Sequence, residues 1–209
     1  MPKIIEASQH NPRGATRIVN LSSGSPQVSN IRWSDINFDK KNNELPEEEK
    51  PREEMMKTWG YTDIGEKSYF PLDGYNRSKV ANVLFGIGAN KRLYEKYGIV
   101  SLAVHPGIIS TELGRNFPPE TFQAIKKMFE NGAWSYKTLG AGASTSLIAA
   151  LDPKLGYGVG ETKDGSENWG AFLIDCQISG NAAPLAVSST EAEKLWDVSE
   201  KLVGQTFAW

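Results

Sequence analysis

The chain has 209 residues, of which 39% are hydrophobic and 23% charged, and its formal net charge is −2. This composition is ordinary for a soluble globular protein and predicts one domain, or two at most. There is no basic excess for a nucleic-acid surface, the single cysteine excludes an internal disulfide framework, and no apolar run approaches the length of a membrane helix. The first residues lack the pattern of a cleaved leader, so we expect a cytoplasmic protein without a membrane span.

Two short apolar runs are typical of buried strands, and a long helical pattern lies between them. Residues 17–21 (RIVNL) end in a serine-, glycine- and proline-rich cluster at 22–26, which stops a strand, and residues 99–104 (IVSLAV) stop at a His-Pro-Gly sequence. We expect Asp73 to cap the start of the helix and Gly98 to end it. Apolar residues recur on one face of this helix at helical spacing: Val80, Val83, Leu84 and Ile87.

The segment between the first strand and the long helix is charged and contains prolines. Its residues 37–58 are predicted to form a solvated loop or a short surface helix, because charge runs usually face water. Residues 37–72 as a whole are expected to be a surface insertion.

The second half of the chain predicts two helices, a short strand and a closing helix, at 118–131, 138–151, 171–174 and 191–203. Cys176 follows the short strand and is expected to be a small buried residue. This order of strands and helices predicts a parallel α/β sheet, in which ligands bind beyond the carboxyl ends of the strands.

Tyr75 and Lys79 are four residues apart on the predicted long helix, so their side chains share a face. An ammonium near a phenol favours the phenolate and lowers the pKa of the phenol from about 10, which suits general acid–base catalysis. By itself this spacing is equally typical of a half-buried tyrosine beside an exposed lysine. However, a serine pair follows one predicted strand and a Pro-Gly pair follows the other, and a parallel sheet brings both to the same edge.

Three segments, in this order, resemble the short-chain dehydrogenase/reductase superfamily, and within it the fungal members of the retinol-dehydrogenase-like group: RIVNLSS, YNRSKVANVLFG and SLAVHPGIISTEL. The tail AEKLWDVSEKLVG resembles the closing helix of that group. The resemblance covers residues 2–36 and 72–204. It implies a Rossmann-like parallel sheet flanked by helices, and hydride transfer between NADP or NAD and a carbonyl or alcohol substrate.

The resemblance also implies roles for individual residues. Tyr75 matches the proton-transferring tyrosine of the family, and Lys79 matches the lysine that binds the nicotinamide ribose and tunes that tyrosine. Ser23 matches the substrate-orienting serine, and its neighbour Ser22 is the less favoured alternative. The segment that lies over the nicotinamide in the family is matched by Pro106, Gly107, Ile109 and Thr111. No metal site is implied, because no His, Cys, Asp and Glu residues have ligand spacing.

A homodimer is possible, because family members often pair through the helix that carries this tyrosine. The apolar face of the predicted long helix serves either such a contact or the sheet.

The chain departs from the family pattern at its start. The family opens with a T-G-x-x-x-G-x-G turn and later has an N-N-A-G strand and a catalytic asparagine, none of which occurs here. The glycines of GYGVG (156–160) are expected to form a surface turn, because no helix-opening third glycine follows. We therefore expect residues 1–209 to form a single partial Rossmann-like domain that is N-terminally truncated and lacks the first strands of the doubly wound fold.

Two hypotheses follow from this departure. The chain is either an NAD(P)-dependent oxidoreductase with Tyr75 as the acid or base, or a catalytically impaired remnant that acts as an interaction module. In both cases the strand at 17–21 would expose its outer edge, and neighbouring helices would show apolar faces. The substrate is expected to be a small molecule.

Overall fold

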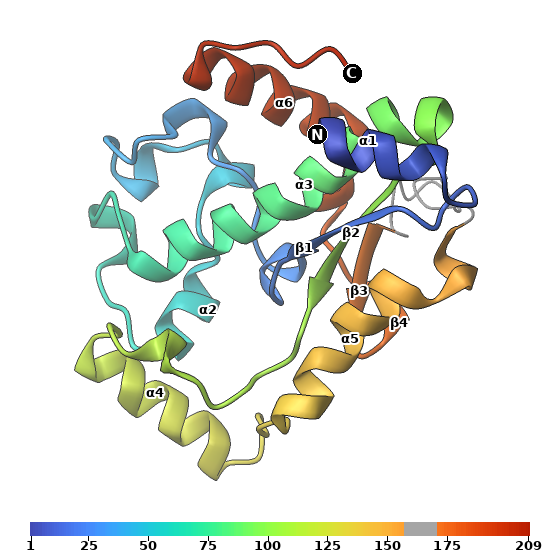
Figure 1. The fold of residues 1–209 in the computed structure, drawn as a ribbon. Helices are drawn as coiled ribbons and strands as arrows, with labels where there is room; N and C mark the ends of the chain where they lie inside the picture. Colours follow the sequence, from blue (N-terminus) through green and yellow to red (C-terminus); the bar gives the residue numbers. More distant parts are fainter. Residues whose placement is uncertain (157–170) are drawn as a thin grey trace.

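The core of the fold is a sheet whose strands lie in the order β1-β2-β3-β4. The computed structural model describes residues 1–156 and 171–209 and shows helices on both faces of this sheet (Figure 1). The strands are β1 (Arg17–Leu21), β2 (Val100–His105), β3 (Phe172–Ile174) and β4 (Gln177–Ile178). The first three run parallel and β4 is antiparallel to β3, which confirms the predicted α/β class with a mostly parallel sheet.

The register of the parallel strands brings their carboxyl ends to one edge of the sheet. Leu21 pairs with Val104, and Val104 pairs with Leu173. Residues that follow β1 and β2 therefore emerge side by side, as the sequence predicted.

The β3–β4 turn corrects one prediction. Asp175 and Cys176 form a two-residue turn with φ of 51° and 65°, a backbone conformation typical of tight hairpins. Such a turn projects from the sheet, so Cys176 is exposed and not buried.

The long helix α3 (Pro71–Tyr97) begins earlier than predicted. Phe70 is its N-cap residue and Pro71 occupies the first turn, where a missing N–H costs nothing. The carboxylate of Asp73 does not cap the helix, because it forms a buried ion pair with Arg77 (Nε–Oδ2, 3.0 Å). Gly98 ends the helix with a φ of 66°, as predicted.

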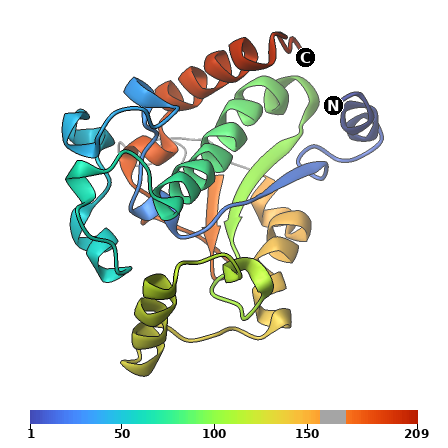
Figure 2. The same cartoon turned by 90° about the vertical axis from the view of Figure 1, so that its left-hand side faces the viewer.

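The apolar face of α3 covers one face of the sheet. Val80, Val83 and Leu84 are fully buried in a cluster with Ala103 of β2 and Phe172 of β3. The closing helix α6 (Ser189–Val203) contributes to the same layer, as Figure 2 shows. This face of α3 therefore serves the sheet.

Helix α5 (Leu139–Leu151) covers the opposite face of the sheet. Its residue Ala149 packs with alternate residues of β2 and with Leu173 of β3. The remaining helices are α1 (Pro2–Gln9), α2 (Glu53–Thr58) and α4 (Pro119–Glu130). Helix α4 lies beyond the carboxyl ends of the strands, away from the sheet (Figure 2). None of the helices in the described ranges is long and apolar enough to cross a membrane.

Strand β1 lies at one end of the sheet, and it pairs only with β2 among the described residues. Apolar side chains near this end are open to solvent: Leu21 of β1 is 56% exposed, and Leu147 and Leu151 of α5 are 56% and 72% exposed. The structure thus agrees with the expected open edge and apolar helix face.

The segment before α3 is less solvated than its charge predicted. The segment contains a small apolar cluster, hereafter the α2 cluster. Its buried members are Met56, Tyr61, Ile64, Phe70 and Leu72. Arg32 is 1% exposed and fixes the beginning of the segment. Its guanidinium donates to Asp35 Oδ2, to Asn42 Oδ1 and to the carbonyls of Lys40 and Ser68. Local apolar residues and one buried arginine therefore order a segment that is mostly charged.

We expect Asp35→Ala to lower the free energy of unfolding by about 3–5 kcal/mol, because it leaves the Arg32 guanidinium buried without its carboxylate. Glu66→Ala is the matched control, since it removes the exposed Lys41–Glu66 pair (2.8 Å) and should cost at most about 1 kcal/mol. Urea unfolding monitored by circular dichroism measures both. Equal costs would show that Arg32 does not anchor the segment.

Candidate active site

The end of β1 and the first turns of α3 bring three predicted site residues together. The Ser22 hydroxyl donates to the carbonyl of Lys79 (2.7 Å), which holds the residues after β1 against the helix. The next residue, Ser23, lies beside the phenol of Tyr75, and its hydroxyl lowers the pKa of that phenol. The Lys79 ammonium lies 5.6 Å from the centre of the Tyr75 ring. A hydroxyl, a phenol and an amine therefore lie on one side of the molecule, beyond the carboxyl end of β1.

The ammonium of Lys79 is tied to the strand. Its Nζ donates to the carbonyl of Leu21 (3.0 Å), and Nδ2 of Asn82 donates to the same oxygen (2.8 Å). Sequence reasoning did not single out Asn82, although its position three residues after Lys79 places it on the same helix face. An ammonium has three donors, so this contact leaves Lys79 able to bind a further oxygen.

The expected lowering of the pKa of Tyr75 is not found. Burial of the half-exposed phenol raises its pKa, and the hydrogen bond with Ser23 opposes this only in part. Lys79 does not contribute to the shift, because its ammonium lies over the ring and is bound to the strand carbonyl. Tyr75 is therefore a protonated phenol at neutral pH.

Ser23 is the first of three polar residues that are hydrogen-bonded to one another. Its Oγ lies 2.5 Å from Oγ of Ser25, and the backbone N–H of Ser25 donates to Ser23 Oγ (3.0 Å). The Ser25 hydroxyl in turn donates to Oδ1 of Asn76 (2.8 Å), the neighbour of Tyr75 on α3. The three side chains of Ser23, Ser25 and Asn76 are all buried. Only Ser23 of these was a sequence-predicted site residue.

The predicted cofactor segment follows β2 at the same edge of the sheet. Gly107 has a φ of 88°, and a Cβ built on it would lie 2.6 Å from Cδ of Lys137. The positive φ favours glycine at this bend, whereas the Lys137 side chain is flexible and could move away from a Cβ. The carbonyl of Ile108 accepts a hydrogen bond from the Lys137 N–H (2.8 Å), which fixes the path of the segment.

The other two predicted cofactor residues differ in their surroundings. The side chain of Ile109 packs against α5, where a Cβ on Gly142 would lie 2.2 Å from its Cδ1. Thr111 is exposed and caps a short turn, with its Oγ1 accepting from the N–H of Leu113 (3.4 Å). Thr111 thus offers a hydroxyl to solvent, whereas Ile109 is engaged in the fold.

His105, the last residue of β2, lies between these two parts of the site. Its Nε2 would be 3.7 Å from a Cβ on Gly24, in the turn that holds Ser23 and Ser25. Burial lowers the pKa of His105, the Lys137 ammonium lowers it further, and Asp175, which is paired with Lys137, opposes the change. From the sequence, His105 was predicted only to mark the end of a strand. No sequence pattern indicated that Lys137 or Asp175 would lie near it.

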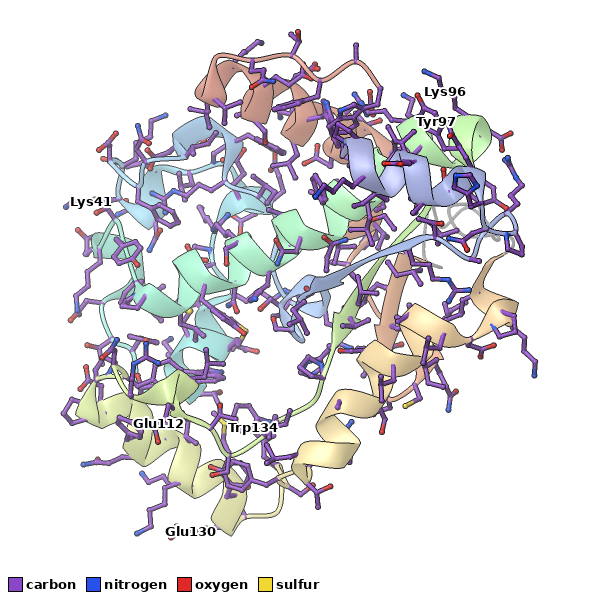
Figure 3. All side chains as sticks on the ribbon, in the orientation of Figure 1. Lys41, Lys96, Tyr97, Glu112, Glu130 and Trp134 are labelled. Atoms are coloured by element: carbon purple, nitrogen blue, oxygen red, sulfur yellow. The ribbon has the colours of Figure 1, made fainter. Side chains whose placement is uncertain are left out.

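Aromatic side chains join the two segments that flank the site. Trp59, which follows α2, contacts Trp134 (ring centres 5.1 Å apart) and Phe117 (6.4 Å). In Figure 3, Trp134 lies on the side of α4 that faces α5. Trp59 and Tyr75 both pack against the α2 cluster. The phenol of Tyr75 therefore borders an apolar region that extends to α4.

The family of the chain follows from the comparisons with known proteins. No family model matches the chain. Retinol dehydrogenase 14 from Homo sapiens is 34% identical over 155 residues, which is 71% of this chain and 42% of that protein. A short-chain dehydrogenase, TIC 32 A of Brassica napus, is 33% identical over 136 residues (65% of this chain, 38% of the relative). An uncharacterized oxidoreductase of Schizosaccharomyces pombe is 46% identical over 83 residues (39% and 23%).

The parallel sheet, the Ser-Tyr-Lys group at its carboxyl edge and these similarities place the chain among the short-chain dehydrogenases, a class of oxidoreductases. Within that class it is related to the retinol dehydrogenases. The chain spans less than half the length of the relatives described above.

Protonation of His105 should destabilise the fold. Because its folded pKa is below the unfolded value of 6.5, the unfolded chain binds more protons in mildly acidic solution, and the free energy of unfolding should fall as the pH drops from about 7.5 to 5.5. His105→Asn should flatten this dependence, and the exposed His10→Asn should not change it. Urea unfolding at several pH values measures the slopes. If the free energy of unfolding of His105→Asn depends on pH as steeply as that of the wild type, the lowered pKa of His105 is contradicted.

Proposed function

We propose that the chain acts as an NAD(P)-dependent oxidoreductase that transfers a hydride between nicotinamide and a carbonyl or alcohol. One observation carries this proposal: Ser23, Tyr75 and the Lys79 ammonium lie together at the edge of the sheet where parallel α/β folds bind ligands. A substrate carbonyl oxygen placed against the hydroxyls of Ser23 and Tyr75 would receive a hydrogen bond from each.

Tyr75 is the proposed acid or base. Its protonated phenol donates a proton to the substrate oxygen during carbonyl reduction, and its phenolate accepts that proton during alcohol oxidation. Ser23 holds that oxygen at the phenol. Lys79 binds the ribose of the cofactor with the donors that the Leu21 carbonyl leaves free. A bound nicotinamide supplies or accepts the hydride.

The residues after β2 fit the nicotinamide end of such a cofactor. The Pro106–Gly107 bend lies at this edge of the sheet with the Lys137 side chain against its glycine, and Thr111 presents its hydroxyl to solvent. The pyrophosphate is normally bound by a glycine-rich turn at a helix N-terminus, and the sequence has no such motif. The residues named above would hold the nicotinamide and the ribose.

The apolar surroundings of Tyr75 support a lipophilic substrate. Tyr75 and Trp59 both pack against the α2 cluster, and aromatic contacts run from Trp59 through Trp134 to Phe129 of α4. Such side chains bind the hydrocarbon body of a substrate better than a charged one.

Tyr75→Phe should lower cofactor-dependent turnover by about 10²–10⁴-fold, because it removes the proton-transferring group and leaves the ring in place. Tyr97→Phe is the matched control at the opposite end of α3 (Figure 3), and it should leave turnover unchanged. Absorbance of NADPH at its nicotinamide band follows the reaction with a lipophilic aldehyde. Turnover that survives Tyr75→Phe would overturn the proposed role.

The open edge of β1 supports a second candidate, an interaction module without catalysis. Its apolar neighbours Leu147 and Leu151 would suit pairing with another chain. Titration with reduced nicotinamide mononucleotide, together with sedimentation analysis, separates the two candidates. Saturable binding by a monomer favours the enzyme, whereas association without nucleotide binding favours the module.

A further inference from the structure

The hydrogen bonds around Ser23 have a definite direction. An amide oxygen only accepts, so the hydroxyl hydrogen of Ser25 is committed to Oδ1 of Asn76 (2.8 Å). The 2.5 Å contact between the two serine oxygens must then use the hydrogen of Ser23. Ser23 therefore donates to Ser25 and has no second hydrogen to offer.

The acceptor capacity of Ser23 is also accounted for. A hydroxyl oxygen has two lone pairs, and the backbone N–H of Ser25 occupies one of them (3.0 Å). The second is left for the phenol, so in this arrangement Ser23 can only accept a hydrogen from Tyr75. The bonds run in one direction, from Tyr75 through Ser23 and Ser25 to Asn76.

This direction opposes the role that catalysis requires of Ser23. To orient a substrate oxygen or to stabilise a phenolate, Ser23 must donate its hydrogen toward Tyr75. In the arrangement described above that hydrogen points the other way, into a buried contact.

We propose that Ser25 and Asn76 form a latch that turns the hydroxyl hydrogen of Ser23 away from Tyr75, and that substrate binding must reverse it. The inference rests on the proposed function for its meaning in catalysis, because Ser23 is the substrate-orienting group there. Ser25 is a positioning residue, since it acts on the substrate only through Ser23. Substrate then gains the Ser23 hydrogen bond at the cost of the Ser23–Ser25 bond.

The latch predicts opposite effects from two neighbouring serines. Ser23→Ala removes the hydroxyl that turns its hydrogen to the phenolate when the latch reverses, so the pKa of Tyr75 should rise. Ser25→Ala releases the hydrogen of Ser23 to the phenolate, so the pKa of Tyr75 should fall by about 0.5–1, the worth of one ordinary hydrogen bond. A merely structural role of Ser25 would not produce this reversal.

The charged and titratable groups near this turn are common to all the variants. Lys79 lies over the Tyr75 ring from the same helix, and His105 of β2 approaches the turn at Gly24. His105 is neutral throughout the alkaline titration, because its pKa is lowered. Differences between variants therefore report the hydroxyl groups.

The test is an NMR titration of the full chain labelled with ¹³Cζ-tyrosine, without cofactor or substrate, in which the signal of Tyr75 is assigned by its loss in Tyr75→Phe. Ser25→Thr keeps a hydroxyl and should restore the wild-type pKa. Ser29→Ala, in the same loop, should leave it unchanged. Asn76→Ala frees the Ser25 hydrogen to turn toward Ser23 and should lower the pKa as Ser25→Ala does, which provides a second route if Ser25→Ala unfolds the chain.

A pKa that rises or stays constant in both Ser25→Ala and Asn76→Ala would overturn the latch. Because the titration needs no turnover, its result is independent of the proposed function. If the expected pKa shifts are absent but turnover depends on Tyr75, the latch is rejected and the proposed function stands. The expected pKa shifts with no turnover would reject the proposed function alone.

Discussion

The carbonyl of Leu21 and the hydroxyl of Ser22 bind the end of β1 to one turn of α3. Lys79 and Asn82 donate to the Leu21 carbonyl, and Ser22 donates back to the carbonyl of Lys79. These reciprocal bonds fix the next residue of the loop at the start of the helix, which is why Ser23 meets Tyr75. Without them, a loop of serine, glycine and proline would have many alternative conformations.

The same bonds determine the electrostatics of the site. Because the Lys79 ammonium is held at the strand end, it does not lower the pKa of Tyr75, and burial raises that pKa instead. The phenol thus enters any reaction as a proton donor. Oxidation of an alcohol requires the phenol of Tyr75 to lose its proton first. The latch of Ser25 and Asn76 would make this deprotonation less favourable, because it turns the Ser23 hydrogen away from the phenolate.

Much of the fold could be predicted from the sequence because its elements are strongly patterned. Local sequence patterns predict the buried face of α3, the apolar strand β2 and Gly98 at the end of α3. The parallel order of the strands then places Ser23, Tyr75 and Gly107 at one edge of the sheet. Two predictions were wrong because of local contacts for which the sequence pattern offered an equally good alternative. Asp73 pairs with Arg77 instead of capping the helix, and Cys176 is exposed because the β3–β4 hairpin turns there.

The order of the charged segment before α3 also had no local signal. Arg32 is buried only because four partners along residues 35–68 converge on it. Lys137 and Asp175 become neighbours of His105 only in the folded chain. A pattern of residue types indicates such groups poorly, since each partner lies in a different element.

The Ser23–Tyr75 contact is tested most directly by a double-mutant cycle on the free energy of unfolding, with Ser23→Ala and Tyr75→Phe singly and together. The measurement needs neither cofactor nor turnover. If the two side chains are hydrogen-bonded, the double variant should lose about 0.5–1.5 kcal/mol less than the sum of the single losses. Losses that add to within about 0.3 kcal/mol would contradict the contact on which the site depends.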